Sequence, residues 1–129
     1  HSTRPYQHVI EPLYAYLMIA AKQYEDSAYS GNYNVGPDEA DCVTTGSLVS
    51  LFCEKWGNIS WENKFVGGPH EANFLKLDCS KLKNTFGWKP RWNIDKALEK
   101  TVEWAKVYLE NGNIGKIMDK QINEFLKNK

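Results

Sequence analysis

Hydrophobic residues recur along this chain mainly at helical spacing, and this pattern predicts an α-rich domain. The first helix is predicted over residues 7–24, and Pro12 lies within its first turns, where it starts or bends the helix. One face of the predicted helix is apolar, and we expect that face to be buried. The apolar face consists of Val9, Leu13, Tyr16, Leu17 and Ala20.

Further helices are predicted from capping residues and glycines. Thr44 or Thr45 can begin one helix, and Gly57 ends it. A short helix runs through residues 80–86, and the clearest one begins at Asn93 and ends at Gly112. A last amphipathic stretch covers residues 114–126. The total is four or five helices.

Two or three short strands are predicted between the helices, over residues 32–37, 59–66 and 74–77. The sequence has no G-x-G-x-x-G between a strand and a helix, so it predicts no dinucleotide-binding fold. We expect residues 1–129 to form a single α/β domain, rich in α-helix. Short strands without a larger sheet favour a substrate-binding lobe that normally sits on something bigger.

Composition and charge exclude several functional classes. The 16 basic and 16 acidic side chains cancel, which disfavours a nucleic-acid-binding domain. The balance is uneven, because residues 1–80 carry a net charge of −5 and residues 81–129 a net charge of +5. No apolar run is long enough to cross a bilayer, and an odd count of three cysteines fits reduced thiols in a cytoplasmic protein.

Arg4 and Asn34 are candidate ligand-binding residues. Arg4 and Arg91 are the only arginines of the chain, and a guanidinium group matches phosphate or carboxylate geometry. Asn34 lies at the end of a predicted strand, where small molecules often bind. The alternatives are an ordinary salt bridge for Arg4 and a turn-closing hydrogen bond for Asn34.

His70 and Glu71 are a second candidate pair, because they follow a Gly-Gly-Pro loop. They could orient a ligand hydroxyl or phosphate, or they could form a solvated turn. His8 is expected to pack on an aromatic ring at the start of a helix. No histidine has ligand spacing for zinc, and no nucleophile–base pair is visible, so we predict no metal site and no catalytic residue.

Two other segments are interpreted structurally. The block from Trp88 to Trp92 mixes aromatic and basic residues, and we expect a connector between helices whose tryptophans pack on the core. The acidic segment at residues 38–41 is expected to be a solvated loop.

Several of these segments resemble the C-terminal part of CDP-glucose 4,6-dehydratases, which belong to the extended short-chain dehydrogenase/reductase superfamily. The resemblance covers nearly the whole chain. Its most specific motifs are RPYQHVIEPL at residues 4–13 and PHEA followed by LKLDCSK at residues 69–81. YNVGP, GWKP and TVEW are similar to motifs of the family or of its wider group.

The resemblance implies a substrate-binding lobe that lacks the Rossmann half, with NAD bound elsewhere in the full-length family and by no residue of this chain. The full enzyme would oxidise C4 of CDP-glucose, eliminate water across C5 and C6 and return the hydride to C6. Arg4 and Asn34 would contact the diphosphate. Related dTDP-glucose enzymes have an arginine in the loop where this chain has His70 and Glu71, so either His70 takes part of that role or the diphosphate is held differently. The isolated chain would be catalytically inert.

Two interpretations of the chain remain open. The first is a lobe that binds CDP-glucose or CDP for the synthesis of surface polysaccharides such as O-antigen. The second is a stand-alone interaction module that has lost ligand binding. Under both, we expect self-association through the apolar surface that a Rossmann domain would cover, and no nucleic-acid or membrane partner.

Overall fold

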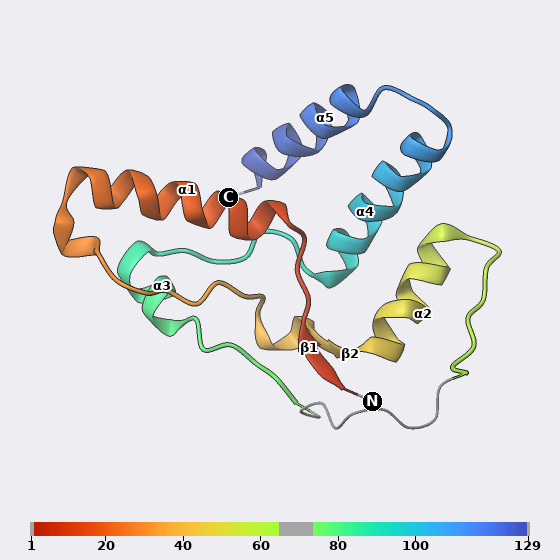
Figure 1. Ribbon diagram of the computed structural model, residues 1–129, viewed down its shortest axis with the longest axis horizontal. Helices are drawn as coiled ribbons and strands as arrows, with labels where there is room; N and C mark the ends of the chain where they lie inside the picture. Colours follow the sequence, from red (N-terminus) through yellow and green to blue (C-terminus); the bar gives the residue numbers. More distant parts are fainter. Residues whose placement is uncertain (1, 65–73, 129) are drawn as a thin grey trace.

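The computed structural model describes residues 2–64 and 74–128 of the chain (Figure 1). These residues contain five α-helices, which are α1 (Ile10–Glu25), α2 (Thr45–Trp56), α3 (Ser80–Phe86), α4 (Ile94–Leu109) and α5 (Ile114–Lys127). Two antiparallel strands, β1 (Thr3–Pro5) and β2 (Cys42–Thr44), accompany them. Two single 3₁₀ turns are η1 (Ser27–Tyr29) and η2 (Glu39–Asp41). The predicted α-rich architecture, with four or five helices and two or three short strands, is confirmed.

Capping residues set the helix boundaries much as predicted. The Thr44 hydroxyl accepts the third backbone N–H of its helix at 3.1 Å, and the Asn93 side chain does the same for α4 at 2.9 Å. Gly57 and Gly87 follow α2 and α3 with positive φ angles of 86° and 62°. Helix α4 ends at Leu109, before the predicted Gly112, because the turn residue with positive φ is Asn111.

The predicted strand positions are wrong. Strands β1 and β2 pair with Thr3 opposite Thr44, although neither segment was predicted as a strand. Residues 32–37 and 59–64 form no strand, residues 65 and 66 lie outside the described residues, and Phe74 makes only an isolated bridge to Thr3. A short extended segment becomes a strand only when another edge lies against it, and the local pattern does not show which edge that is.

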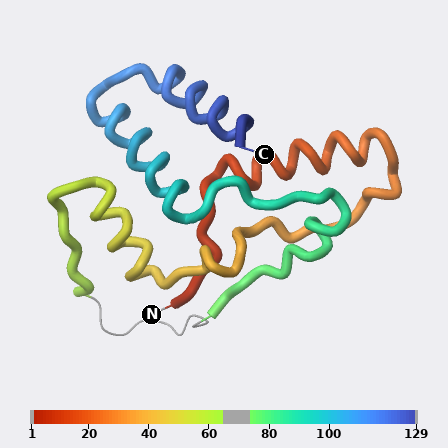
Figure 2. The backbone as a smooth tube through the Cα atoms, turned by 180° about the vertical axis from the view of Figure 1, so that it is seen from behind, coloured from red at the N-terminus to blue at the C-terminus, as the bar shows by residue number. Residues whose placement is uncertain are grey.

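The elements are arranged around the small β1–β2 pair (Figures 1 and 2). Helices α4 and α5 form an antiparallel hairpin, and α2 packs against α4. Helices α1 and α3 lie on the other side of the strands, where Ala15, Ile19, Leu82 and Trp88 form the buried core. The connector between α3 and α4 therefore joins the two halves.

The buried side of α1 is opposite to the predicted one. All five residues of the predicted apolar face are largely exposed, including Leu17 at 73%. The buried residues of α1 are Glu11, Ala15 and Ile19. The prediction failed because α1 is apolar on both sides, so its hydrophobic pattern does not select one face.

A network of ion pairs holds the α4–α5 hairpin together. The Lys100 ammonium is buried and contacts the carboxylates of Glu124 and Glu103. Lys120 also pairs with Glu103, whose pKa falls to about 2: three side-chain hydrogen bonds outweigh its burial. The network stabilises the negative charge of Glu103 in the folded state.

None of the helices within residues 2–64 and 74–128 has the length and apolar character needed to cross a membrane.

Candidate functional site

Arg4 lies on strand β1, which is fixed from two sides. It is opposite Val43 of β2, and the neighbouring Thr3 carbonyl accepts the N–H of Leu75 at 3.1 Å. The Arg4 side chain is half-buried, and its Nη1 donates to the Thr3 carbonyl at 3.0 Å. Two distant segments of the chain therefore position the backbone of this arginine.

Asn34 makes a contact that the sequence did not predict. Its side-chain Nδ2 donates to the carbonyl of Asp78 at 3.1 Å, across 44 residues of sequence. Two residues later, a Cβ atom at Gly36 would lie 3.1 Å from the Leu77 side chain, so the two segments approach closely. Asn34 is thus a tie between segments, rather than the closing residue of a local turn.

Residues 74–78 connect the two candidates. The β1 strand that carries Arg4 is bonded near the start of this segment, and Asn34 is bonded at its end. Three residue steps separate the two bonded positions, which is at most about 11 Å of extended chain. The described contacts join Arg4 and Asn34 to this segment and not to each other. His70 and Glu71 lie outside the described residues.

A cavity of about 230 Å³ lies beside the same segment. Its lysines are ion-paired: Lys76 contacts Glu39, and Lys83 lies 2.6 Å from Asp38. The hydrogen bond from Lys76 lowers the pKa of the Glu39 carboxyl. The sequence interpretation missed both ion pairs, because their partners are 37 and 45 residues apart.

The acidic segment at residues 38–41 is only partly solvated, so that prediction needs correction. Asp41 is buried, and its carboxylate accepts the N–H of Ile94 at 2.9 Å at the start of α4. It therefore helps to fix α4, whereas Asp38 and Glu39 remain exposed and pair with lysines.

The thiols at this cavity are unreactive in character. Cys42 and Cys79 line it, and burial raises the pKa of both thiols, which favours the neutral form. With Cys53 they are the three free cysteines of the chain, all buried or half-buried as predicted. Within residues 2–64 and 74–128, no three histidine, cysteine or acidic side chains gather as a set of metal ligands.

The largest hollow is a groove of about 500 Å³ between the start of α1 and the α4–α5 hairpin. Leu13 lines it from α1, Trp104 lines it from α4, and Met118 and Ile122 line it from α5. Sequence reasoning identified these residues as apolar but assigned them to the core. No signal in the sequence placed α1 opposite α5.

His8 and Glu11, at the start of α1, have structural roles. The His8 ring packs edge-on against Trp92 with 5.1 Å between centroids, as predicted, and burial lowers its pKa. Glu11 is fully buried and accepts the N–H groups of Arg91 and Trp92 at 2.8 and 2.7 Å. Burial nevertheless raises the pKa of Glu11, because desolvation outweighs these hydrogen bonds.

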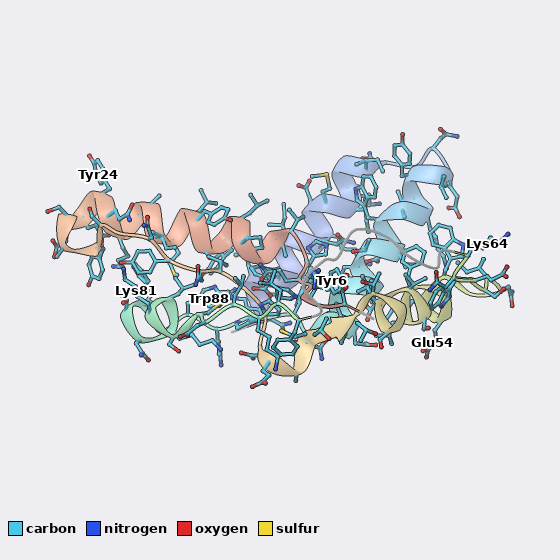
Figure 3. The ribbon with its side chains drawn as sticks, turned by 60° about the horizontal axis from the view of Figure 1, so that its bottom comes forward. Tyr6, Tyr24, Glu54, Lys64, Lys81 and Trp88 are labelled. Atoms are coloured by element: carbon cyan, nitrogen blue, oxygen red, sulfur yellow. The ribbon has the colours of Figure 1, made fainter. Side chains whose placement is uncertain are left out.

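The connector from Trp88 to Trp92 also packs as predicted. Both tryptophans are buried, and Figure 3 shows Trp88 between the layers of α1 and α3. The Arg91 guanidinium donates to the Tyr14 hydroxyl at 2.9 Å and to the Phe125 carbonyl at 3.0 Å. Arg91 therefore links α1 to the end of α5 and is not a ligand-binding arginine.

The residues of this chain do not fit NAD. Dinucleotide-binding folds hold the pyrophosphate at a glycine-rich turn between a parallel strand and a helix. The sequence contains no such glycine motif, and the strands of the described residues are one antiparallel pair. No step of a reaction that uses NAD is therefore assigned to these residues.

Comparison with known proteins agrees with the resemblance found in the motifs. No protein-family model matches the chain. The chain is 35% identical over 128 residues to the CDP-glucose 4,6-dehydratase of Salmonella typhimurium, a match that covers 98% of this chain and 36% of that protein. A stretch of 43 residues, 33% of this chain and 11% of the relative, is 46% identical to a probable dTDP-glucose 4,6-dehydratase of Sinorhizobium fredii. The chain is thus homologous, over nearly its whole length, to one part of a CDP-glucose 4,6-dehydratase and spans about a third of that relative's length.

Proposed function

We propose that this chain is the nucleotide-sugar-binding part of a protein of the CDP-glucose 4,6-dehydratase type. The observation that carries the proposal is the 35% identity to that dehydratase over 98% of the chain. The ligand would be CDP-glucose or CDP, and binding would not need a catalytic residue within this chain.

The placement of Arg4 and Asn34 supports this role. A guanidinium group provides a planar fork of N–H donors that matches phosphate oxygens. Arg4 and Asn34 both adjoin residues 74–78, so a ligand with a diphosphate between nucleoside and hexose could reach both. His70 and Glu71 precede this segment in the sequence and are proposed to contribute to the same site.

The isolated chain is proposed to be catalytically inert. Its residues do not fit NAD, and in this proposal the cofactor and the catalytic groups belong to other parts of the dehydratase-like protein. The three free thiols are consistent with a reducing compartment such as the cytoplasm. We place the full protein in the synthesis of deoxygenated sugars for surface polysaccharides.

A second candidate function is an interaction module without ligand binding. The exposed apolar residues of α1 favour it, because contiguous apolar patches mark interaction sites. Under either function, the isolated chain is proposed to self-associate through this patch at high concentration.

Calorimetric titration with CDP-glucose tests the proposal, with CDP and dTDP as comparison ligands. We expect saturable binding that prefers the cytidine nucleotides. Arg4→Ala removes a charge-assisted contact of about 1.5–3 kcal/mol, so its dissociation constant should rise roughly 10- to 150-fold. Asn34→Ala should also weaken binding, because the tie to Asp78 is lost.

Lys89→Ala is the matched control, since it removes an exposed cation from the connector between α3 and α4. Its affinity should equal that of the unchanged chain. Absence of saturable binding at millimolar CDP-glucose, with the chain folded by circular dichroism, would reject the binding function and leave the interaction module.

A further inference from the structure

Helix α1 is apolar on both sides, and this chain covers only one of them. The ten residues from Pro12 to Ala21 include no charged side chain. Ala15 and Ile19 are buried in the core, whereas Leu17 is 73% exposed on the opposite side. A helix that is hydrophobic all round is typical of an element packed from both sides. The open side of α1 therefore lacks a covering layer.

The groove described above continues this apolar side. Leu13 belongs both to the exposed side of α1 and to the groove, whose other walls come from α4 and α5. In Figure 3 the labelled Tyr24, near the far end of α1, points away from the rest of the molecule. We define the α1–α5 surface by its central residues, which are Leu13, Tyr16, Leu17, Trp104, Met118 and Ile122.

The polar groups of the groove are already engaged within the chain. The Gln121 side chain donates to the Lys100 carbonyl at 2.9 Å, and the Thr101 hydroxyl donates to the Ala97 carbonyl at 2.8 Å. His8 accepts a backbone N–H, and its lowered pKa favours the neutral ring. The groove thus offers uncharged, apolar walls, which suit the side chains of a protein partner better than a phosphate-containing ligand.

Charged residues are concentrated on other faces of the molecule. Ion pairs such as Lys55–Asp95 and Lys96–Glu99 lie around the start of α4. None of the residues that define the α1–α5 surface is charged. Depletion of charge is the property that distinguishes the core of a protein interface from the remaining surface.

The occupant is argued from the length of the homologous dehydratase. The chain spans 36% of that protein, so almost two thirds of such a protein must contact this part somewhere. Permanent interfaces are more hydrophobic than transient ones. We infer that the α1–α5 surface is where the remainder of the dehydratase-like protein packs on this chain, an inference that rests on the proposed function.

Hydroxyl-radical footprinting tests the inference. The matched part of the Salmonella dehydratase is replaced by this chain, and side-chain oxidation is compared between the chimera and the free chain at a dilution where the free chain is monomeric. We expect Tyr16 and Met118 to be oxidised at least about fivefold more slowly in the chimera, because an interface core excludes water. The buried Trp92 reports that both proteins are folded. The protection should not change on 100-fold dilution, since it is intramolecular.

Two leucines provide matched variants. Leu17→Lys changes a residue of the α1–α5 surface, and Leu109→Lys changes one that is 63% exposed at the end of α4, outside it. Both should leave the free chain folded. In the chimera, only Leu17→Lys should restore oxidation of Met118. Footprinting the aligned positions of the intact Salmonella enzyme gives the same information if the chimera does not fold.

Full oxidation of Tyr16 and Met118 in the folded chimera, or in the intact relative at the aligned positions, would overturn the inference. Protection that disappears on dilution would also overturn it, because the occupant would then be a second copy of the chain. No nucleotide enters this experiment. Protection without CDP-glucose binding would therefore reject only the ligand, and binding without protection would reject only the docking surface.

Discussion

Replacement of Glu11 by alanine is expected to weaken the connection between the two halves of the molecule. Glu11 is fully buried in the first turn of α1, and one of its oxygens accepts the N–H groups of Arg91 and Trp92. These two residues lead into α4. The alanine variant leaves both buried N–H groups without their acceptor.

The magnitude follows from the contacts. Two hydrogen bonds to a charged acceptor, at the lower value of about 1.5 kcal/mol each, contribute about 3 kcal/mol. The lost methylene adds about 0.8 kcal/mol. The raised pKa of Glu11 shows that its buried charge carries a desolvation cost, and relief of that cost offsets part of the loss. We expect the free energy of unfolding to fall by about 3 kcal/mol, which corresponds to a decrease in Tm of roughly 10 °C.

Urea and thermal unfolding, followed by circular dichroism and tryptophan fluorescence, measure this change. Glu11→Gln is the control, because it keeps an acceptor oxygen and the side-chain shape but removes the charge. A raised carboxyl pKa means that stability is lost as the pH rises from the unfolded value of 4.5 through the folded value. The glutamine variant should not show this loss. An alanine variant whose free energy of unfolding lies within about 1 kcal/mol of the unchanged chain would refute the reasoning.

Three further predictions concern α4 and α5. Lys100→Met leaves the Glu103 and Glu124 carboxylates without their buried cation and should lower the free energy of unfolding by about 3 kcal/mol, whereas the exposed control Lys116→Met should leave it unchanged within about 0.5 kcal/mol in thermal denaturation. The pKa of Glu103 is lowered from 4.5 to about 2, so its contribution is complete above pH 4.5 and is lost as the pH falls toward 2; urea unfolding across this range should show a steeper loss than in Glu103→Gln. Asn93→Ala removes the N-cap of α4 and should cost about 1 kcal/mol, and an unchanged urea midpoint would contradict the capping role.

The helices and several of their ends could be predicted from the sequence. Thr44 and Asn93 were identified as capping residues, and Gly57 and Gly87 as helix ends, because these roles depend on nearby backbone groups and on local conformation. The burial of the two tryptophans that flank the connector was also predicted. Large aromatic side chains next to a proline-containing turn have few other places to go.

The candidate site was predicted only in part. The motif resemblance identified Arg4 and Asn34, but the long-range contacts that place both beside residues 74–78 come from the tertiary structure. The ion pairs of Lys76 and Lys83 were missed for the same reason. Hydrogen bonds between residues some forty positions apart leave no periodic signal in the sequence.

The sequence by itself determined that this chain forms amphipathic or apolar helices with defined ends, since those properties depend on neighbouring residues. Only the tertiary structure decided which side of α1 is buried, where the strands pair, and that the Glu11 carboxylate is enclosed. A helix that is apolar all round satisfies either orientation, and a three-residue segment becomes a strand only beside a partner. These choices depend on the free energy of packing between distant segments, which local propensity does not contain.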